Sequence, residues 1–176
     1  NGAKAGKPVI LDADGLNILA MHPQWMKFLG EQTILTPHMG EMSRLCGLDV
    51  SELKEDPVAR AYQYAEKSGG VLVLKDACTV VTDQNEKLYL NLSGNSGMAT
   101  AGSGDVLSGI IAAVLCMYLS CEEEQELSYK AALAVYIHGL CGDIAREKKG
   151  SHGMTAKDMI EALPEVLKLA EVQRKG

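Results

Sequence analysis

A glycine-rich segment, Ala101–Gly109 (AGSGDVLSG), has the residue types and spacing best suited to chemistry. The small residues Gly102, Ser103 and Gly104 lead directly into Asp105 and an apolar run, which predicts a tight loop entering a helix. The first turn of a helix directs unpaired N–H groups and the positive end of the helix dipole at one point, which suits an anion. A carboxylate beside a phosphate is repelled unless it handles a proton. The segment therefore predicts phosphoryl transfer to a hydroxyl group with Asp105 as base, while an ordinary helix start with an acidic first turn remains the alternative.

A second segment with reactive side chains is Thr36–Glu41 (TPHMGE), which directly follows a short apolar run. Here Pro37 fixes the backbone and Gly40 permits close approach to a ligand. His38 could hydrogen-bond a polar substrate, and Glu41 could hold a hydrated Mg²⁺ through water near a phosphate. The alternative is structural, with His38 capping a turn and Glu41 lying in the first turn of a helix.

A third polar segment follows another apolar run and consists of Lys75, Asp76, Ala77, Cys78 and Thr79. The ammonium group of Lys75 suits a nucleotide phosphate, and the loop backbone suits the rest of the nucleotide. A plain turn into a hairpin is the alternative for this segment.

The remaining polar residues give weaker signals. Asp12 and Asp14 end an apolar run and could contact a metal or a substrate hydroxyl. His22, His138 and His152 have no spacing that predicts a ligand set, so we interpret them as structural or surface residues.

The elements that must position these residues are short strands alternating with helices. Buried parallel strands are predicted within 8–14 and over 33–36 and 71–74, and a hairpin over 79–82 and 87–91. Helices are predicted over 25–29, 40–47, 57–68, 106–118 and 127–146, with a last one opened by the capping-box pattern at 155–158 and Pro164 as its candidate break. This order predicts an α/β fold with a mostly parallel sheet, whose carboxyl edge carries the ligand site.

Composition narrows the classes of function. The chain has 176 residues, 47% of them hydrophobic, and a net charge of −6, which predicts one domain over residues 1–176 and disfavours a nucleic-acid or anionic-membrane surface. Its five cysteines include no C-x-x-C pair, so we expect reduced thiols in a cytoplasmic protein. No apolar stretch is long enough to predict a membrane span.

Taken together, the segments LDADGLN, ILTPHMGEM, VLVLKDACTVV, NSGMATAGSGDVLSGIIAAV and GMTAKDMIEALP resemble the ADP- or ATP-dependent NAD(P)H-hydrate dehydratases. The resemblance extends over essentially the whole chain, and TPHMGE and AGSGDVLSG are its most specific parts. It implies a ribokinase-like, three-layer α/β/α fold with a mostly parallel central sheet plus a β-hairpin. It also implies metabolite repair: the hydroxyl of hydrated NADH or NADPH (NADHX or NADPHX) is phosphorylated by ADP or ATP, and phosphate elimination restores the reduced coenzyme.

The resemblance also implies roles for single residues. Asp105 would be the base and contact the hydrate, and His38 would bind the hydrate. Gly102, Ser103 and Gly104 would hold the transferred phosphoryl group, with Gly104 also near the nucleotide. The loop from Lys75 to Thr79 would line the nucleotide, and Mg²⁺ would bridge its phosphates. A homo-oligomer, commonly a tetramer in this family, is implied as well.

Two departures from the family pattern stand out. Asp76 occupies a position where family members commonly carry glycine, and family domains extend further at the amino end, so we expect this chain to lack its amino-terminal part. A small-molecule kinase of the same fold, acting on a vitamin precursor or sugar, is the alternative enzyme. A non-catalytic nucleotide-binding module is the alternative outside enzymes. The sequence does not distinguish ADP from ATP as the donor.

Overall fold

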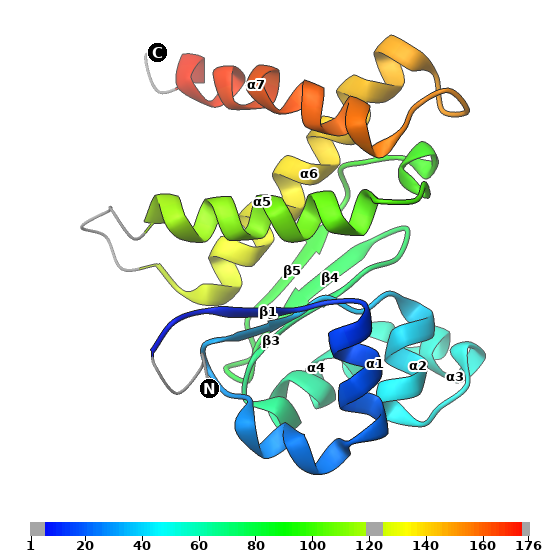
Figure 1. Cartoon of the computed structure of the whole chain (residues 1–176), viewed down its shortest axis with the longest axis vertical. Coiled ribbons are helices and arrows are strands. Elements are labelled where there is room, and N and C mark those ends of the chain that lie inside the picture. Colours follow the sequence, from blue (N-terminus) through cyan, green and yellow to red (C-terminus); the bar gives the residue numbers. More distant parts are fainter. Residues whose placement is uncertain (1–5, 119–124, 174–176) are drawn as a thin grey trace.

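The computed structural model describes residues 6–118 and 125–173 and has three layers, with a sheet between two sets of helices (Figure 1). The sheet has five strands in the order β1-β2-β3-β4-β5, with bounds β1 Val9–Leu11, β2 Thr33–Leu35, β3 Val71–Leu74, β4 Thr79–Thr82 and β5 Leu88–Asn91. The predicted α/β/α layering and all five predicted strands are confirmed.

The sheet is parallel at one side and antiparallel at the other. Strands β1, β2 and β3 run parallel, with Ile34 paired to both Ile10 and Val71. The β4–β5 hairpin continues the same sheet, because β4 pairs antiparallel with β3. The carboxyl ends of β1, β2 and β3 therefore share one edge.

One face of the sheet is covered by four helices, α1 Asp14–Met21, α2 Met39–Cys46, α3 Val50–Glu55 and α4 Pro57–Ser68, seen below it in Figure 1. Leu35, Leu72 and Leu74 point to this side and pack in one core with residues of all four helices. The neighbouring residues Ile34 and Val73 belong to the opposite core, as the two-residue period of a strand requires. The predicted boundaries of α4 are confirmed: the Asp56 side chain caps its start and Gly69 ends it in a left-handed conformation.

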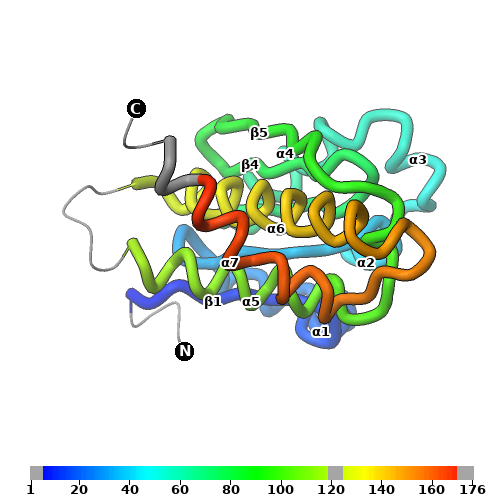
Figure 2. Tube along the Cα trace, turned by 90° about the horizontal axis from the view of Figure 1, so that it is seen from above, coloured from blue at the N-terminus to red at the C-terminus, as the bar shows by residue number. Residues whose placement is uncertain are grey.

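The other face is covered by α5 Ser103–Tyr118 and α6 Leu127–Lys149, with α7 Ala156–Gln173 packed on them further from the sheet (Figures 1 and 2). One half of the predicted capping box of α7 is present, since the Asp158 side chain accepts a hydrogen bond from the Thr155 amide; the Thr155 hydroxyl donates to the same carboxylate. Pro164 does not break this helix. Pro164 lacks the amide that would have paired with the carbonyl of Ile160, a residue that is 55% exposed.

Two helices begin elsewhere than the sequence predicts. The helix predicted over 106–118 starts three residues earlier, since α5 begins at Ser103, and it leaves Ala112 and Ala113 exposed. No helix is predicted directly after Asp12, but α1 begins at Asp14 and includes Asn17, whose side chain accepts a hydrogen bond from Arg44. No helix within the described ranges is long and apolar enough to span a membrane.

Candidate active site

The three parallel strands deliver the predicted segments to one edge of the sheet. Asp12 follows β1, the Thr36–Glu41 segment follows β2, and Lys75 follows β3. A parallel bridge joins His38 to Lys75, and the Lys75 amide donates to the Pro37 carbonyl at 2.8 Å. The structure thus places the second and third predicted segments side by side.

Asp12 is the polar centre of this edge. One carboxylate oxygen accepts from Lys75 Nζ at 2.9 Å, and the other accepts from Ser108 Oγ of α5 at 2.8 Å. Partial burial alone would raise the pKa of Asp12, but the hydrogen bonds from Lys75 and Ser108 and the Lys75 charge outweigh it and lower the pKa. Asp12 is therefore an ionised anchor that joins β1, β3 and α5.

The backbone after Asp12 is strained. Ala13 has φ 46° and ψ −114°, a conformation that residues with a Cβ rarely adopt, and its amide donates to the Asp12 carboxylate at 3.0 Å. Sequence reasoning gave Asp12 only a weak signal, and the strain at Ala13 is invisible in the sequence.

The start of α5 has the features of an anion seat. The Ser103 amide donates to Thr100 and the Val106 amide to Gly102, so the amides of Gly104 and Asp105 lie in the first turn, where helix geometry supplies no acceptor. A Cβ placed on Gly104 would stand 3.4 Å from Lys75 Nζ. An ammonium group and the positive end of a helix therefore meet over Gly104. Asp105 is exposed in the same turn.

Gly102 is required by the backbone of the loop. Its φ is +85°, and an added Cβ would lie 3.2 Å from Ala156 of α7. The loop thus passes close to α7 just before it enters α5.

A residue interpreted from sequence as structural or surface lies against this seat. His138 of α6 is 8% exposed, and its Nε2 is 3.5 Å from Ser103 Oγ. Burial lowers the pKa of His138 to about 4, the Ser103 backbone opposes that shift, and the Lys75 charge adds to it. The imidazole is therefore neutral at physiological pH.

The loop before α5 is held by α6. Asp143 accepts from the Gly94 amide at 2.9 Å and from Asn95 Nδ2 at 3.0 Å. Side chains at Gly139 and Gly142 would collide with Ser93 and Met98 of the loop. The small residues in NSGMATAGSGD and on α6 allow this close packing, a signal that was present in the sequence but not interpreted.

The His38 segment shows the capping arrangement that was the structural alternative. His38 Nδ1 accepts from the amides of Gly40 at 3.0 Å and Glu41 at 3.2 Å, while Glu41 Oε2 accepts from the His38 amide at 2.8 Å. Because Nδ1 is an acceptor, a neutral His38 carries its hydrogen on Nε2. Its side chain is 54% exposed, so it remains open to a ligand.

The third segment forms an open turn at the same edge. Asp76 and Ala77 are exposed, Cys78 and Thr79 are half-buried, and Thr79 begins β4. The roles of Asp76 and its neighbours in lining a nucleotide stay predictions.

The residues at this edge do not form a protein-built metal cage. No group of three histidine, cysteine or acidic side chains suited to a metal occurs among residues 6–118 and 125–173. Asp12 is engaged with Lys75 and Ser108, and Glu41 with the backbone amide of His38. The donor set fits Mg²⁺ only as a hydrated ion carried by nucleotide phosphates.

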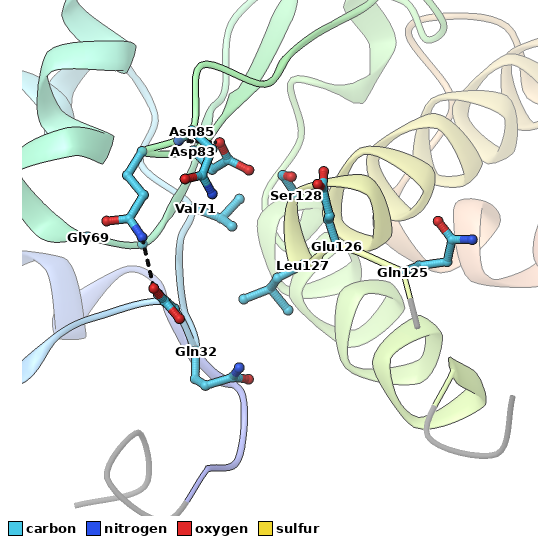
Figure 3. Close-up of a pocket in the computed structure, with 12 residues that line it drawn as sticks. Gln32, Gly69, Val71, Asp83, Asn85, Gln125, Glu126, Leu127 and Ser128 are labelled. Carbon is cyan, nitrogen blue, oxygen red and sulfur yellow. Dashed lines mark hydrogen bonds between the residues drawn. The ribbon is translucent and has the colours of Figure 1, made fainter. Parts of the chain in front are cut away.

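A pocket of about 470 Å³ lies at the opposite edge, between the amino ends of β2 and β3, the β4–β5 turn and the start of α6 (Figure 3). Gln84 spans its mouth with a hydrogen bond to Glu31 at 3.2 Å. Its carboxylates, Glu31, Asp83 and Glu126, would repel a phosphate. The candidate site for a phosphate is therefore the carboxyl edge of the sheet.

Comparison with known proteins agrees with the resemblance. A model of the NAD(P)H-hydrate dehydratase family matches residues 3–165. A bifunctional NAD(P)H-hydrate repair enzyme Nnr of Thermofilum pendens is 44% identical over 92% of this chain, which covers 30% of that relative. An ADP-dependent (S)-NAD(P)H-hydrate dehydratase of Neisseria meningitidis is 36% identical over 89% of this chain and 52% of its own length. The chain thus spans from about a third to about half of these relatives.

Solved structures agree on the fold. An ADP/ATP-dependent NAD(P)H-hydrate dehydratase from Bacillus subtilis, co-crystallised with ATP and Mg²⁺, superposes with a TM-score of 0.74 at 33% identity, over 92% of this chain and 56% of that one. A ribokinase-like superfamily protein from Enterococcus faecalis gives a TM-score of 0.74 at 29% identity. A hydroxyethylthiazole kinase from Pyrococcus horikoshii, at 15% identity, shares the fold alone. The ribokinase-like fold is confirmed, and the chain belongs to the NAD(P)H-hydrate dehydratase family.

Proposed function

We propose that this chain carries the catalytic edge of a nucleotide-dependent NAD(P)H-hydrate dehydratase, which restores NADH and NADPH from their hydrates. The observation that carries the proposal is the convergence at Gly104, where the Lys75 ammonium meets the amino end of α5 one residue before Asp105. The Neisseria relative bears the name of this activity, and the Bacillus enzyme was co-crystallised with ATP and Mg²⁺.

In the proposed reaction, Asp105 accepts the proton of the hydrate hydroxyl as that oxygen attacks the terminal phosphorus of ADP or ATP. The amides of the α5 first turn and Lys75 stabilise the charge on the phosphoryl group. The phosphorylated hydroxyl then leaves as inorganic phosphate, with loss of a ring proton, and the products are the reduced coenzyme, phosphate and AMP or ADP. The exposed side of the His38 ring contacts the hydrate, while its Nε2 lies 3.5 Å from Glu41 Oε1.

Mg²⁺, when bound, would neutralise the nucleotide phosphates. Glu41 would reach it only through water, and the Lys75–Thr79 turn would line the nucleotide. A homo-oligomer and a single domain over residues 1–176 also belong to the proposal.

Incubation of the chain with NADH hydrate and Mg²⁺, with ADP, with ATP or without nucleotide, tests this function. We expect the near-ultraviolet absorbance of reduced nicotinamide to recover only when a nucleotide is present. The nucleotide that supports recovery is then the phosphoryl donor. Phosphorylation of a vitamin precursor or sugar without recovery of NADH would favour the kinase. Nucleotide binding without any turnover would favour a binding module.

A further inference from the structure

His138 is a buried polar side chain that the reaction above does not use. It lies on α6, which packs against the loop that leads into α5: the Tyr136 carbonyl accepts a hydrogen bond from the Ser93 hydroxyl, and Asp143 holds Gly94 and Asn95. Its Nε2 is 3.5 Å from Ser103 Oγ, and Ser103 is the first residue of α5. The imidazole therefore contacts the first residue of the helix whose amino end forms the anion seat.

The protonation state of His138 restricts what it can do. A neutral imidazole has one N–H donor and one acceptor nitrogen. Burial lowers the pKa of His138 to about 4, so it is neutral, while a hydrogen bond with the Ser103 backbone raises the pKa. At Ser103 Oγ the neutral ring can therefore either donate a hydrogen or accept the hydroxyl hydrogen. In both cases the contact favours one orientation of the Ser103 hydroxyl.

We propose that His138 is a positioning residue. Its buried ring holds the Ser103 hydroxyl in one orientation at the start of α5, through the contact between Nε2 and Ser103 Oγ. This proposal rests on the proposed function, because it deepens the role of the seat without adding a reacting group.

A double-mutant cycle tests whether His138 acts through Ser103. His138→Leu and Ser103→Ala should each lower kcat or nucleotide affinity about tenfold, and the double variant should be no worse than either single one. His138→Gln should keep most of the activity because its amide nitrogen occupies about the place of Nε2, whereas the shorter His138→Asn should not. His152→Gln, on an exposed histidine, is the matched control and should match the unmodified chain.

Additive effects of His138→Leu and Ser103→Ala would overturn the proposal, as would equal loss in His138→Gln and His138→Asn at equal unfolding midpoints. Imidazole ¹⁵N NMR of the ligand-free chain gives an independent result. Ser103→Ala should shift the Nε2 resonance of His138, and an unchanged Nε2 resonance would overturn the proposal. Absence of hydrate turnover in the unmodified chain, with that shift present, would instead count against the proposed function, and the cycle would then be measured on ADP affinity.

Discussion

The charged side chains around the start of α5 determine the role that each of them can have in the proposed reaction. Lys75 lies over Gly104 and is paired with the ionised Asp12 at 2.9 Å, so the ammonium group is held in place beside the amino end of α5 and its charge is partly balanced. Asp105 stands at the rim of this seat and is exposed to the solvent from which a hydroxyl substrate would come. Its carboxylate is suited to take a proton once phosphates have filled the seat.

Asp105→Asn keeps the shape of the side chain and removes its basicity. Turnover of NADH hydrate should fall by at least about 100-fold, because general-base catalysis is lost, while ADP affinity should change little. Steady-state rates and calorimetric ADP binding check this. Glu147→Gln, on an exposed acidic residue of α6, is the control. An Asp105→Asn enzyme with undiminished kcat would show that another group is the base.

Gly102→Ala and Gly109→Ala make a matched pair of glycine substitutions. Gly102 has φ +85° and a neighbour 3.2 Å from its added Cβ, so the change should cost about 1–2 kcal/mol of unfolding free energy. Gly109 lies inside α5 with nothing within 4 Å of an added Cβ, so alanine there should stabilise by about 0.5–1 kcal/mol. Urea denaturation measures both, and effects of the same sign would contradict this account.

At the scale of elements, α6 fixes the loop that leads into the seat. Asp143→Ala removes the acceptor for Gly94 and Asn95 and should cost about 2–3 kcal/mol of unfolding free energy. Amide hydrogen exchange at Gly94 should accelerate in the same variant. Glu147→Ala, one turn further along α6 and exposed, should change neither quantity. An unchanged exchange rate at Gly94 in Asp143→Ala would mean that the loop is held by other contacts.

Elements with strong local signals could be predicted from the sequence. Strand β3 is a run of four apolar residues, and α4 carries Asp56 and Pro57 at its start and Gly69 at its end. The start of α5 was placed three residues late, at Val106, because Ser103 and Gly104 are poor helix formers on their own. Helix α1 was missed because it begins after a strained residue, Ala13, which has no sequence signature.

Part of the site could also be predicted from the sequence. His38 and Lys75 each follow a predicted strand, so they were expected at the same edge of the sheet, and the bridge between them agrees. The contacts of Asp12 with Ser108 and of His138 with Ser103 join residues 96 and 35 positions apart, so local patterns could not reveal them.

For the whole molecule, His138 links stability to pH. Its pKa is about 4 in the folded chain against an ordinary value of 6.5, so between these values the unfolded chain binds a proton that the folded chain does not. The free energy of unfolding should therefore fall, by up to about 3 kcal/mol, as the pH falls through this window. Asp12, whose pKa is also lowered, adds to the loss only below its ordinary value of 3.8.

Urea denaturation above and within this window checks the linkage. His138→Gln should lose most of the dependence between 6.5 and 4, since glutamine does not titrate, whereas His152→Gln should retain it. The same dependence in His138→Gln as in the unmodified chain would assign it to other groups.

The stoichiometry of phosphate release tests the central claim most directly. If Asp105 activates the hydrate hydroxyl for phosphorylation and elimination follows, each NADH recovered is accompanied by one molecule of inorganic phosphate and one of AMP or ADP. We predict equimolar formation of NADH and phosphate, and loss of both in Asp105→Asn. Recovery of NADH without phosphate release, or steady phosphate release without recovery of NADH, would contradict the account.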